Sequence, residues 1–158
     1  MKRSTVELRV ALASCALAAF AVPLVAADSE YGSLDAKAIA IRPPADMQWK
    51  GGDRGIEQIV LAGDPSKPGL YVVLAKWYPH RNSRPHFHPN DRYITVISGT
   101  WWVGTGRKYD ESSMRPVPAG SFVTHFAKEV HYDGARDGEV ILQIVGMGPA
   151  TANSAEDR

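Results

Sequence analysis

The chain has 158 residues, of which 44% are hydrophobic and 22% are charged, with 18 Lys and Arg against 17 Asp and Glu. These proportions are ordinary for one folded domain, and they exclude a disordered chain or a collagen-like repeat. A net charge of +1 without a basic block leaves no electrostatic footprint for nucleic acid, and a single cysteine excludes a disulfide scaffold.

Residues 1–27 have the three parts of a secretory signal peptide. Lys2 and Arg3 form a positively charged start, an uncharged run rich in Ala, Leu and Val occupies 10–26, and small residues precede a cleavage site after Ala27. The run is about 17 residues long, which is the short limit for a membrane span, and Pro23 interrupts it. We therefore expect no transmembrane segment in the mature chain.

Cleavage after Ala27 predicts an exported protein that is periplasmic or secreted. The mature chain would hold no cysteine, because Cys15 is the single one, and this suits an oxidising compartment. The stretch that ends at Cys15 also resembles a bacterial lipobox, so lipidation is the alternative. N-terminal sequencing of the mature protein tests the cleavage, and an intact Met1 on a cytoplasmic product would refute it.

After a lead-in segment at 28–50, in which Pro43 and Pro44 disfavour a long helix, the chain reads as short strands. Stretches rich in Val, Ile, Tyr, Trp and Thr alternate with turns that contain Gly and Pro. The expected strands are 56–62, 70–77, 93–98, 100–104, 121–126, 130–133 and 140–145. Without a helical period in this part, 51–149 predicts an all-β sandwich or barrel. The small, polar tail at 150–158 is expected to be flexible.

All five histidines lie between His80 and His131, and His86 and His88 form an H-x-H pair. Residues i and i+2 share one face of a strand, so these two imidazoles can converge on one metal ion while Phe87 faces away. The spacing alone leaves open the alternative of a solvated histidine pair.

The surroundings of the pair resemble the two conserved motifs of the cupin superfamily over about residues 45–149. Gly99 follows His88 at the spacing of the first cupin motif, and His131 follows Gly120 at that of the second. The resemblance implies an antiparallel cupin-like β-barrel, also called a double-stranded β-helix or jelly roll. It also implies one divalent transition metal ion (Zn, Fe, Mn, Ni or Cu). The implied ligands are His86, His88 and His131.

Two positions depart from the cupin pattern. Arg92 stands where the first motif has a glutamate ligand, and a guanidinium cannot bind a cation. The Pro-x-Gly of the second motif is replaced by Phe-Ala-Lys at 126–128, so we expect another turn shape there. His125 lies just before this turn and is a candidate fourth ligand. The alternative is that His125, like His80, is an ordinary strand or loop residue.

Several residues near the motifs are candidates for ligand recognition: Arg84, Arg92, Tyr93 and Trp101. Arginines recognise carboxylate and phosphate groups, which predicts a small, anionic molecule as the partner. The alternative is that Arg81, Arg84 and Arg92 belong to a solvated loop. Trp101 and Trp102 are neighbours on an expected strand, so one should face the barrel interior and the other should pack outside.

Three neutral histidine ligands with open positions resemble a catalytic site more than a structural one. We therefore expect a metal-dependent enzyme in which the ion acts as a Lewis acid or activates oxygen. Because the glutamate ligand is missing, the alternative is a cupin that binds a small ligand or a metal without turnover. A metal-free barrel is the third hypothesis. Sheet edges at the ends of such a barrel also predict a homodimer.

Overall fold

The computed structural model describes residues 34, 35 and 37–157. The predicted signal peptide with Cys15, and the first part of the lead-in segment, lie outside these residues. The chain divides into two units, Met1–Ile41 and Arg42–Arg158, and all the strands belong to the second. Among the residues described, none of the helices has the length and apolar character needed to cross a membrane.

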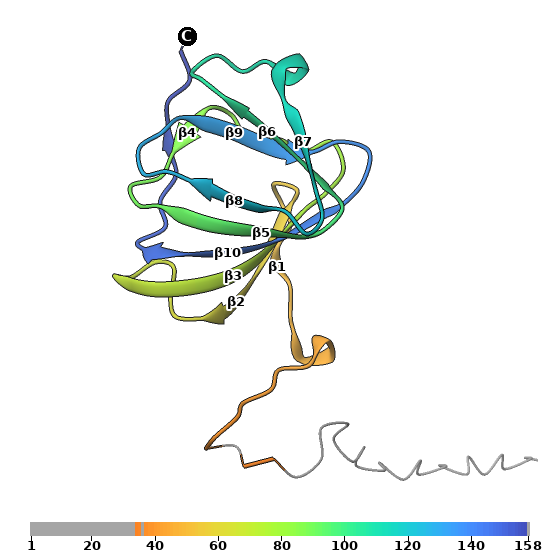
Figure 1. The fold of residues 1–158 in the computed structure, drawn as a ribbon, viewed down its shortest axis with the longest axis vertical. Helices are drawn as coiled ribbons and strands as arrows, with labels where there is room; N and C mark the ends of the chain where they lie inside the picture. The colour runs from red at the N-terminus through yellow and green to blue at the C-terminus, as the bar shows by residue number, and fades with distance from the viewer. Residues whose placement is uncertain (1–33, 36, 158) are drawn as a thin grey trace, which may run out of the picture. The chain divides into compact units, whose positions relative to one another are not determined.

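Two antiparallel sheets face each other and form a barrel (Figure 1). In spatial order, sheet A consists of β1 (Lys50–Gly51), β2 (Ile56–Ala62), β3 (Gly69–Trp77), β10 (Val140–Gly148), β5 (Arg92–Ser98) and β8 (Phe122–His125). Sheet B consists of β11 (Asn153–Ser154), β4 (His86–Phe87), β9 (His131–Ala135), β6 (Thr100–Thr105) and β7 (Arg115–Pro118). Two short 3-10 helices, η1 (Pro44–Asp46) and η2 (Glu111–Ser113), complete the described elements. The predicted all-β barrel is confirmed.

The core lies between the sheets because side chains alternate along each strand. Strands β3 and β10 are paired over nine residues, from Val140 opposite Trp77 to Gly148 opposite Gly69. Every second residue of both strands is buried, and together they supply Tyr71, Val73, Ala75, Trp77, Val140, Leu142 and Ile144 to the core. Each large apolar side chain buried in this way contributes about 1.5–3 kcal/mol.

Each of the seven expected strands is present, with ends that differ by at most three residues. The strands that the sequence did not predict are β1, β4 and β11, which have two residues each, and β7. Strand β7 was missed because Pro116 and Pro118 lack the N–H that a ladder requires. It lies at the edge of sheet B, where a proline can turn its missing donor away from the neighbouring strand.

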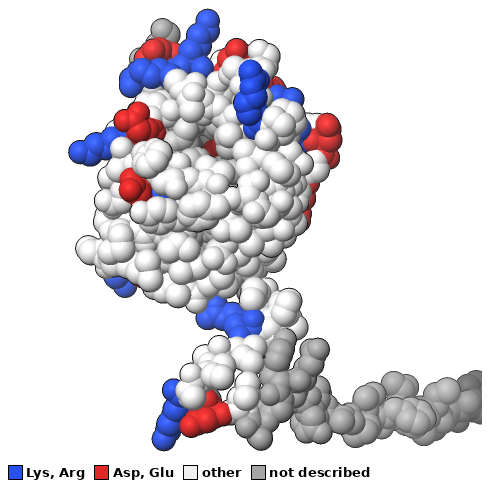
Figure 2. All heavy atoms as spheres, in the orientation of Figure 1, with Lys and Arg blue, Asp and Glu red and all other residues white. Residues whose placement is uncertain are grey.

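Sheet A carries exposed apolar side chains on its outer face: Leu70, Tyr93, Ile97, Phe122 and Met147. The rings of Tyr93 and Phe122 stack with their centroids 6.4 Å apart. In the view of Figure 2, charged side chains gather mainly around one end of the barrel and leave a broad area with few charges. Exposed apolar side chains on one face of a sheet favour association, and the homodimer stays a prediction.

Within the tail at 150–158, which the sequence predicts to be flexible, residues 153–155 are hydrogen-bonded to β4 and to Pro85. Strand β11 pairs with β4, placing Asn153 opposite Phe87, and the amide of Ala155 donates to the Pro85 carbonyl at 2.9 Å. Two ion pairs, Arg84–Glu156 and Arg107–Asp157, join the segment to the rest of the barrel. Backbone hydrogen bonds hold this segment, and a search for hydrophobic runs cannot detect them.

Candidate metal centre

Three histidines converge at one end of the barrel. His86 of β4 lies directly opposite His131 of β9, and His88 follows β4. One ring nitrogen of each residue lies within 4.8 Å of the corresponding nitrogens of the other two. The ring centroids of His86 and His131 are 4.5 Å apart, and those of His88 and His131 are 5.3 Å apart. The structure thus brings together the three ligands implied by the cupin motifs.

The second nitrogen of each ring identifies its tautomer. Nδ1 lies 2.8 Å from the Arg84 carbonyl in His86, 2.8 Å from the Thr151 carbonyl in His88, and 3.1 Å from the Glu129 carbonyl in His131. A carbonyl oxygen can only accept, so each Nδ1 carries the proton and donates it. Each Nε2 is then the unprotonated nitrogen that carries a lone pair, which is the arrangement of a metal-binding histidine.

Burial favours the neutral form of His88 and His131. It lowers the pKa of His88 to about 3, with a further contribution from the positive charge of Arg92. Burial also lowers the pKa of His131, against the opposing effect of the Asp133 carboxylate. Nε2 of His131 is buried without a hydrogen-bond partner. A divalent transition metal fits these residues, because neutral imidazole is its ligand form and an ion would satisfy the orphaned nitrogen.

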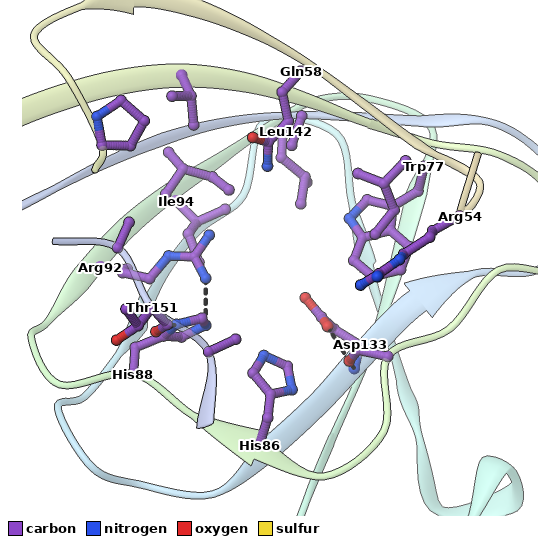
Figure 3. A pocket seen from close by; sticks show the side chains of 18 of the residues that line it. Arg54, Gln58, Trp77, His86, His88, Arg92, Ile94, Asp133, Leu142 and Thr151 are labelled. Atoms are coloured by element: carbon purple, nitrogen blue, oxygen red, sulfur yellow. Dashed lines mark hydrogen bonds between the residues drawn. The ribbon is translucent and has the colours of Figure 1, made fainter. Parts of the chain in front are cut away.

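His86 and His88 line a cavity of about 820 Å³ between the two sheets. Its walls include Trp77, Ile94 and Leu142 of sheet A and His86 of sheet B (Figure 3). Trp101 of sheet B also lines it. Residues 149–152, which follow β10, form a further part of the lining. The volume is in the range of small-molecule sites, and apolar walls with a few polar groups are typical of them.

Solved structures of three proteins share this arrangement of strands. The polyketide cyclase RemF from Streptomyces resistomycificus has a TM-score of 0.61 and 13% identity, over 76% of this chain and 87% of its own. KdgF from Halomonas sp. has a TM-score of 0.55 and 18% identity, over 68% and 94%. An RmlC-like cupin from Shewanella frigidimarina has a TM-score of 0.55 and 15% identity, over 69% and 89%.

The chain has the cupin fold. The resemblance predicted from the spacing of its histidines and glycines is therefore confirmed at the level of fold. The sequence itself matches no protein-family model, and no curated protein matches it significantly. At these identities the shared fold does not carry over a substrate or a reaction, so the function has to be argued from the site.

Two turns of the cupin motifs show how the barrel positions its histidines. Gly99 has φ +79, and a Cβ atom there would lie 2.2 Å from the Glu139 carbonyl oxygen, so only glycine fits. Lys128 stands at the glycine position of the second motif, yet it adopts φ +66, which favours glycine. Its amide donates to the His88 carbonyl at 2.8 Å. The turn at 126–128 therefore keeps a residue with left-handed backbone conformation, although lysine replaces the glycine of the motif.

Arg92, the departure at the glutamate position, points into the barrel. It begins β5 opposite His125, lines the cavity, and donates from Nη1 to Nε2 of His88 (Figure 3). Its Nε is buried without a partner. The guanidinium thus lies against the lone pair that a metal ion would use on His88.

His125 lies outside the group of three. Its ring centroid is 3.7 Å from that of His131 and 5.3 Å from that of Trp101. The side chain is buried, and burial lowers its pKa to about 2, followed by the effects of His131 and Arg92. Nδ1 of His125 has no hydrogen-bond partner. As a fourth ligand His125 stays a prediction, because its ring packs against His131 without joining the convergent nitrogens.

Of the other candidates for ligand recognition, Trp101 and Arg84 line the cavity and Tyr93 does not. Tyr93 was a wrong prediction: it is 43% exposed on the outer face of sheet A, because residues of β5 alternate and its neighbour Ile94 points inward. Trp101 is fully buried and lines the cavity. Trp102 faces outward, as expected for a neighbour, with the guanidinium of Arg136 3.5 Å above its ring. Arg84 lines the cavity and is ion-paired with Glu156.

Asp133 and Arg54 also line the cavity, and neither was predicted. Figure 3 shows them across the cavity from Arg92 and His88. Asp133 is buried, and its Oδ1 accepts from the Ser83 hydroxyl at 2.5 Å. The strand period could have found Asp133, since it lies two residues after His131 and shares its face of β9. Arg54 has no such signal, because a turn before β2 places it.

Stability of the metal-free barrel should fall in mild acid. The folded pKa values of His88 and His125, about 3 and about 2, lie below the ordinary value of 6.5. The unfolded chain therefore binds more protons below pH 6.5. The two neutral histidines therefore make their full contribution to the free energy of unfolding above pH 6.5. That contribution is lost as the pH falls from 6.5 towards their pKa values in the folded state. Each histidine contributes a slope of up to about 1.4 kcal/mol per pH unit.

Urea unfolding with a chelator present, from about pH 8 to about pH 5, measures this slope. His125→Gln removes one of the two groups, so its free energy of unfolding should change less steeply with pH below 6.5. A slope that is the same in His125→Gln and in the parent protein would show that His125 does not resist protonation in the folded state.

Proposed function

We propose that this protein is a metal-dependent enzyme that acts on a small anionic molecule. The observation that carries the proposal is the set of three histidines, His86, His88 and His131. Their Nδ1 atoms donate to backbone carbonyls and their Nε2 atoms converge beside a cavity of about 820 Å³. These residues would hold one divalent transition metal ion. Bound there, the ion would supply Lewis-acid or oxygen-activating chemistry.

The charges that line the cavity support an anionic ligand. Three arginines line it, Arg54, Arg84 and Arg92, whereas Asp133 is the single carboxylate among the described lining residues. Arg84 is ion-paired with Glu156, but Arg54 and Arg92 have no carboxylate partner in the part of the chain described. A guanidinium without a partner can bind a carboxylate or phosphate in bidentate fashion.

Side chains of the cavity would orient the ligand, exclude water and transfer a proton. Arg92 would orient the anionic group next to the histidines, and the apolar side chains Ile94, Leu142 and Trp77 would exclude water. Asp133, held through Oδ1 by Ser83, is a carboxylate that can accept or return a proton on the other side of the cavity (Figure 3). RemF, which has the same fold, is a polyketide cyclase, and this supports an enzyme.

A cupin that binds a small ligand without turnover is the second candidate. One observation favours it: Arg92 occupies the position of the glutamate ligand and contacts Nε2 of His88. Loss of a carboxylate ligand leaves fewer groups to hold an ion during catalysis. Turnover distinguishes the two candidates, and oxygen uptake with a panel of small carboxylates is the first assay.

Metal content tests what both candidates share. Protein purified without a histidine tag and reconstituted with Zn, Fe, Mn, Ni or Cu should hold about one equivalent of one of these ions, measured by elemental analysis. Less than about 0.1 equivalent of every ion after reconstitution would defeat both.

We also propose that the protein is exported to the periplasm or beyond. The charged start, apolar run and small residues of 1–27 support export. The three candidate metal ligands are histidines and none is a cysteine, which also suits a compartment in which cysteines are oxidised.

A further inference from the structure

Arg92 and a metal ion would compete for the same atom of His88. The Nδ1–H of His88 donates to the Thr151 carbonyl at 2.8 Å, so Nε2 is the acceptor nitrogen, and it accepts from Nη1 of Arg92. An ion held by all three histidines needs that lone pair. The guanidinium must therefore leave His88 before the three residues can bind an ion together.

In the described part of the chain, no carboxylate is paired with Arg92. The Nε of Arg92 is buried without a partner. The neighbouring Asp91 accepts from the Ala127 amide at 2.7 Å, and Asp133 is held by Ser83. A guanidinium that leaves His88 can pair with an anion inside the cavity only if a ligand brings that anion.

The balance of charge leads to the same result. Three neutral imidazoles leave a divalent ion with its full charge of +2, and a nearby guanidinium repels it more strongly where water is excluded. A carboxylate can pair with Arg92 through two hydrogen bonds, and its negative charge offsets the repulsion. The ion and the carboxylate would each reduce the cost of binding the other.

We propose that a divalent metal ion and a small carboxylate bind this site cooperatively, and that Arg92 couples them. The guanidinium turns from Nε2 of His88 to the carboxylate, and the ion takes the released nitrogen. This inference rests on the proposed function and names the class of its ligand. Coupling between two ligands is reciprocal, so each must raise the affinity for the other by the same factor.

Zinc titration of metal-free protein, by calorimetry or against a chromophoric chelator, measures this coupling. One series contains sodium acetate as the carboxylate probe, and the other contains sodium chloride at equal ionic strength, because salt alone screens charges. Zinc affinity should be about tenfold higher in acetate. Acetate binding, followed by NMR with and without zinc, should change by the same factor.

Arg92→Gln separates the guanidinium from the rest of the site. This variant should bind zinc about tenfold more tightly than the parent protein in chloride, and acetate should no longer change its affinity. Arg107→Gln is the matched control, since it also removes one guanidinium, but Arg107 pairs with Asp157 and is not among the residues that line the cavity. It should keep the response to acetate.

The outcomes distinguish this inference from the proposed function. Stoichiometric zinc binding that is unaffected by acetate would overturn the coupling and leave the histidine site intact. Equal loss of the acetate response in Arg107→Gln would overturn the role of Arg92. Absence of zinc binding in the parent protein and in Arg92→Gln, with or without acetate, would overturn the proposed function as well. If Arg92→Gln folds poorly, the parent protein still tests the coupling, because zinc and acetate must each raise the affinity for the other by the same factor.

Discussion

Replacing His131 with alanine is expected to abolish stoichiometric metal binding. His131 supplies one of three convergent nitrogens, and its Nε2 has no other partner. Loss of a ligand should cost more than the roughly 10- to 100-fold in affinity that loss of an outer partner costs. Elemental analysis of reconstituted protein should therefore find less than about 0.1 equivalent. His86→Ala and His88→Ala should behave alike, and circular dichroism should show an intact barrel.

His125→Ala is the matched control for this experiment. His125 is buried and packs against His131 with ring centroids 3.7 Å apart, so its removal disturbs the same region without removing a convergent nitrogen. It should keep about one equivalent of metal. Metal retained in His131→Ala but lost in His125→Ala would show that His125 is the ligand and that the second cupin motif is misplaced.

Removing residues 150–158 is expected to weaken metal binding by about 10- to 100-fold. The Thr151 carbonyl accepts from Nδ1 of His88 at 2.8 Å, and this contact keeps the proton on Nδ1 and the lone pair on Nε2. The truncated chain would lose that contact and part of the cavity wall. Zinc titration of the truncated, metal-free protein measures the change. An affinity equal to that of the full chain would show that His88 needs no support from Thr151.

Two further variants show which contacts of this segment matter. Glu156→Gln combined with Asp157→Asn removes both ion pairs but keeps the backbone hydrogen bonds of β11. Exposed pairs contribute about 0–1 kcal/mol, so zinc affinity should change little. Ala155→Asp places a charge at a buried position and should release the segment in a full-length chain. Ala155→Asp should lower zinc affinity as the truncation does, and it serves as the test if the truncated protein folds poorly.

The barrel could be predicted from the sequence because its signals are local. Alternation of apolar residues along β3, β5 and β10 follows from the two-residue period of a strand, and glycines such as Gly99 mark turns that tolerate no side chain. The H-x-H of His86 and His88 depends on the same period, and the motif spacing added His131. Tyr93 lies on the outer face of sheet A because it is one position after Arg92, and the strand keeps its regular alternation there.

The sequence by itself thus determined the all-β fold and the shared face of His86 and His88, since short-range periodicity and turn chemistry specify both. His131 was added by the resemblance to the second cupin motif. Tertiary structure alone decided the support of those histidines. The Thr151 carbonyl reaches His88 across 63 positions of the chain, and Ser83 reaches Asp133 across 50. It also decided that Arg92 points at His88. Such contacts depend on how β11, β5 and β9 are brought together in space, and hydrogen bonds between distant segments leave no periodic pattern in the sequence.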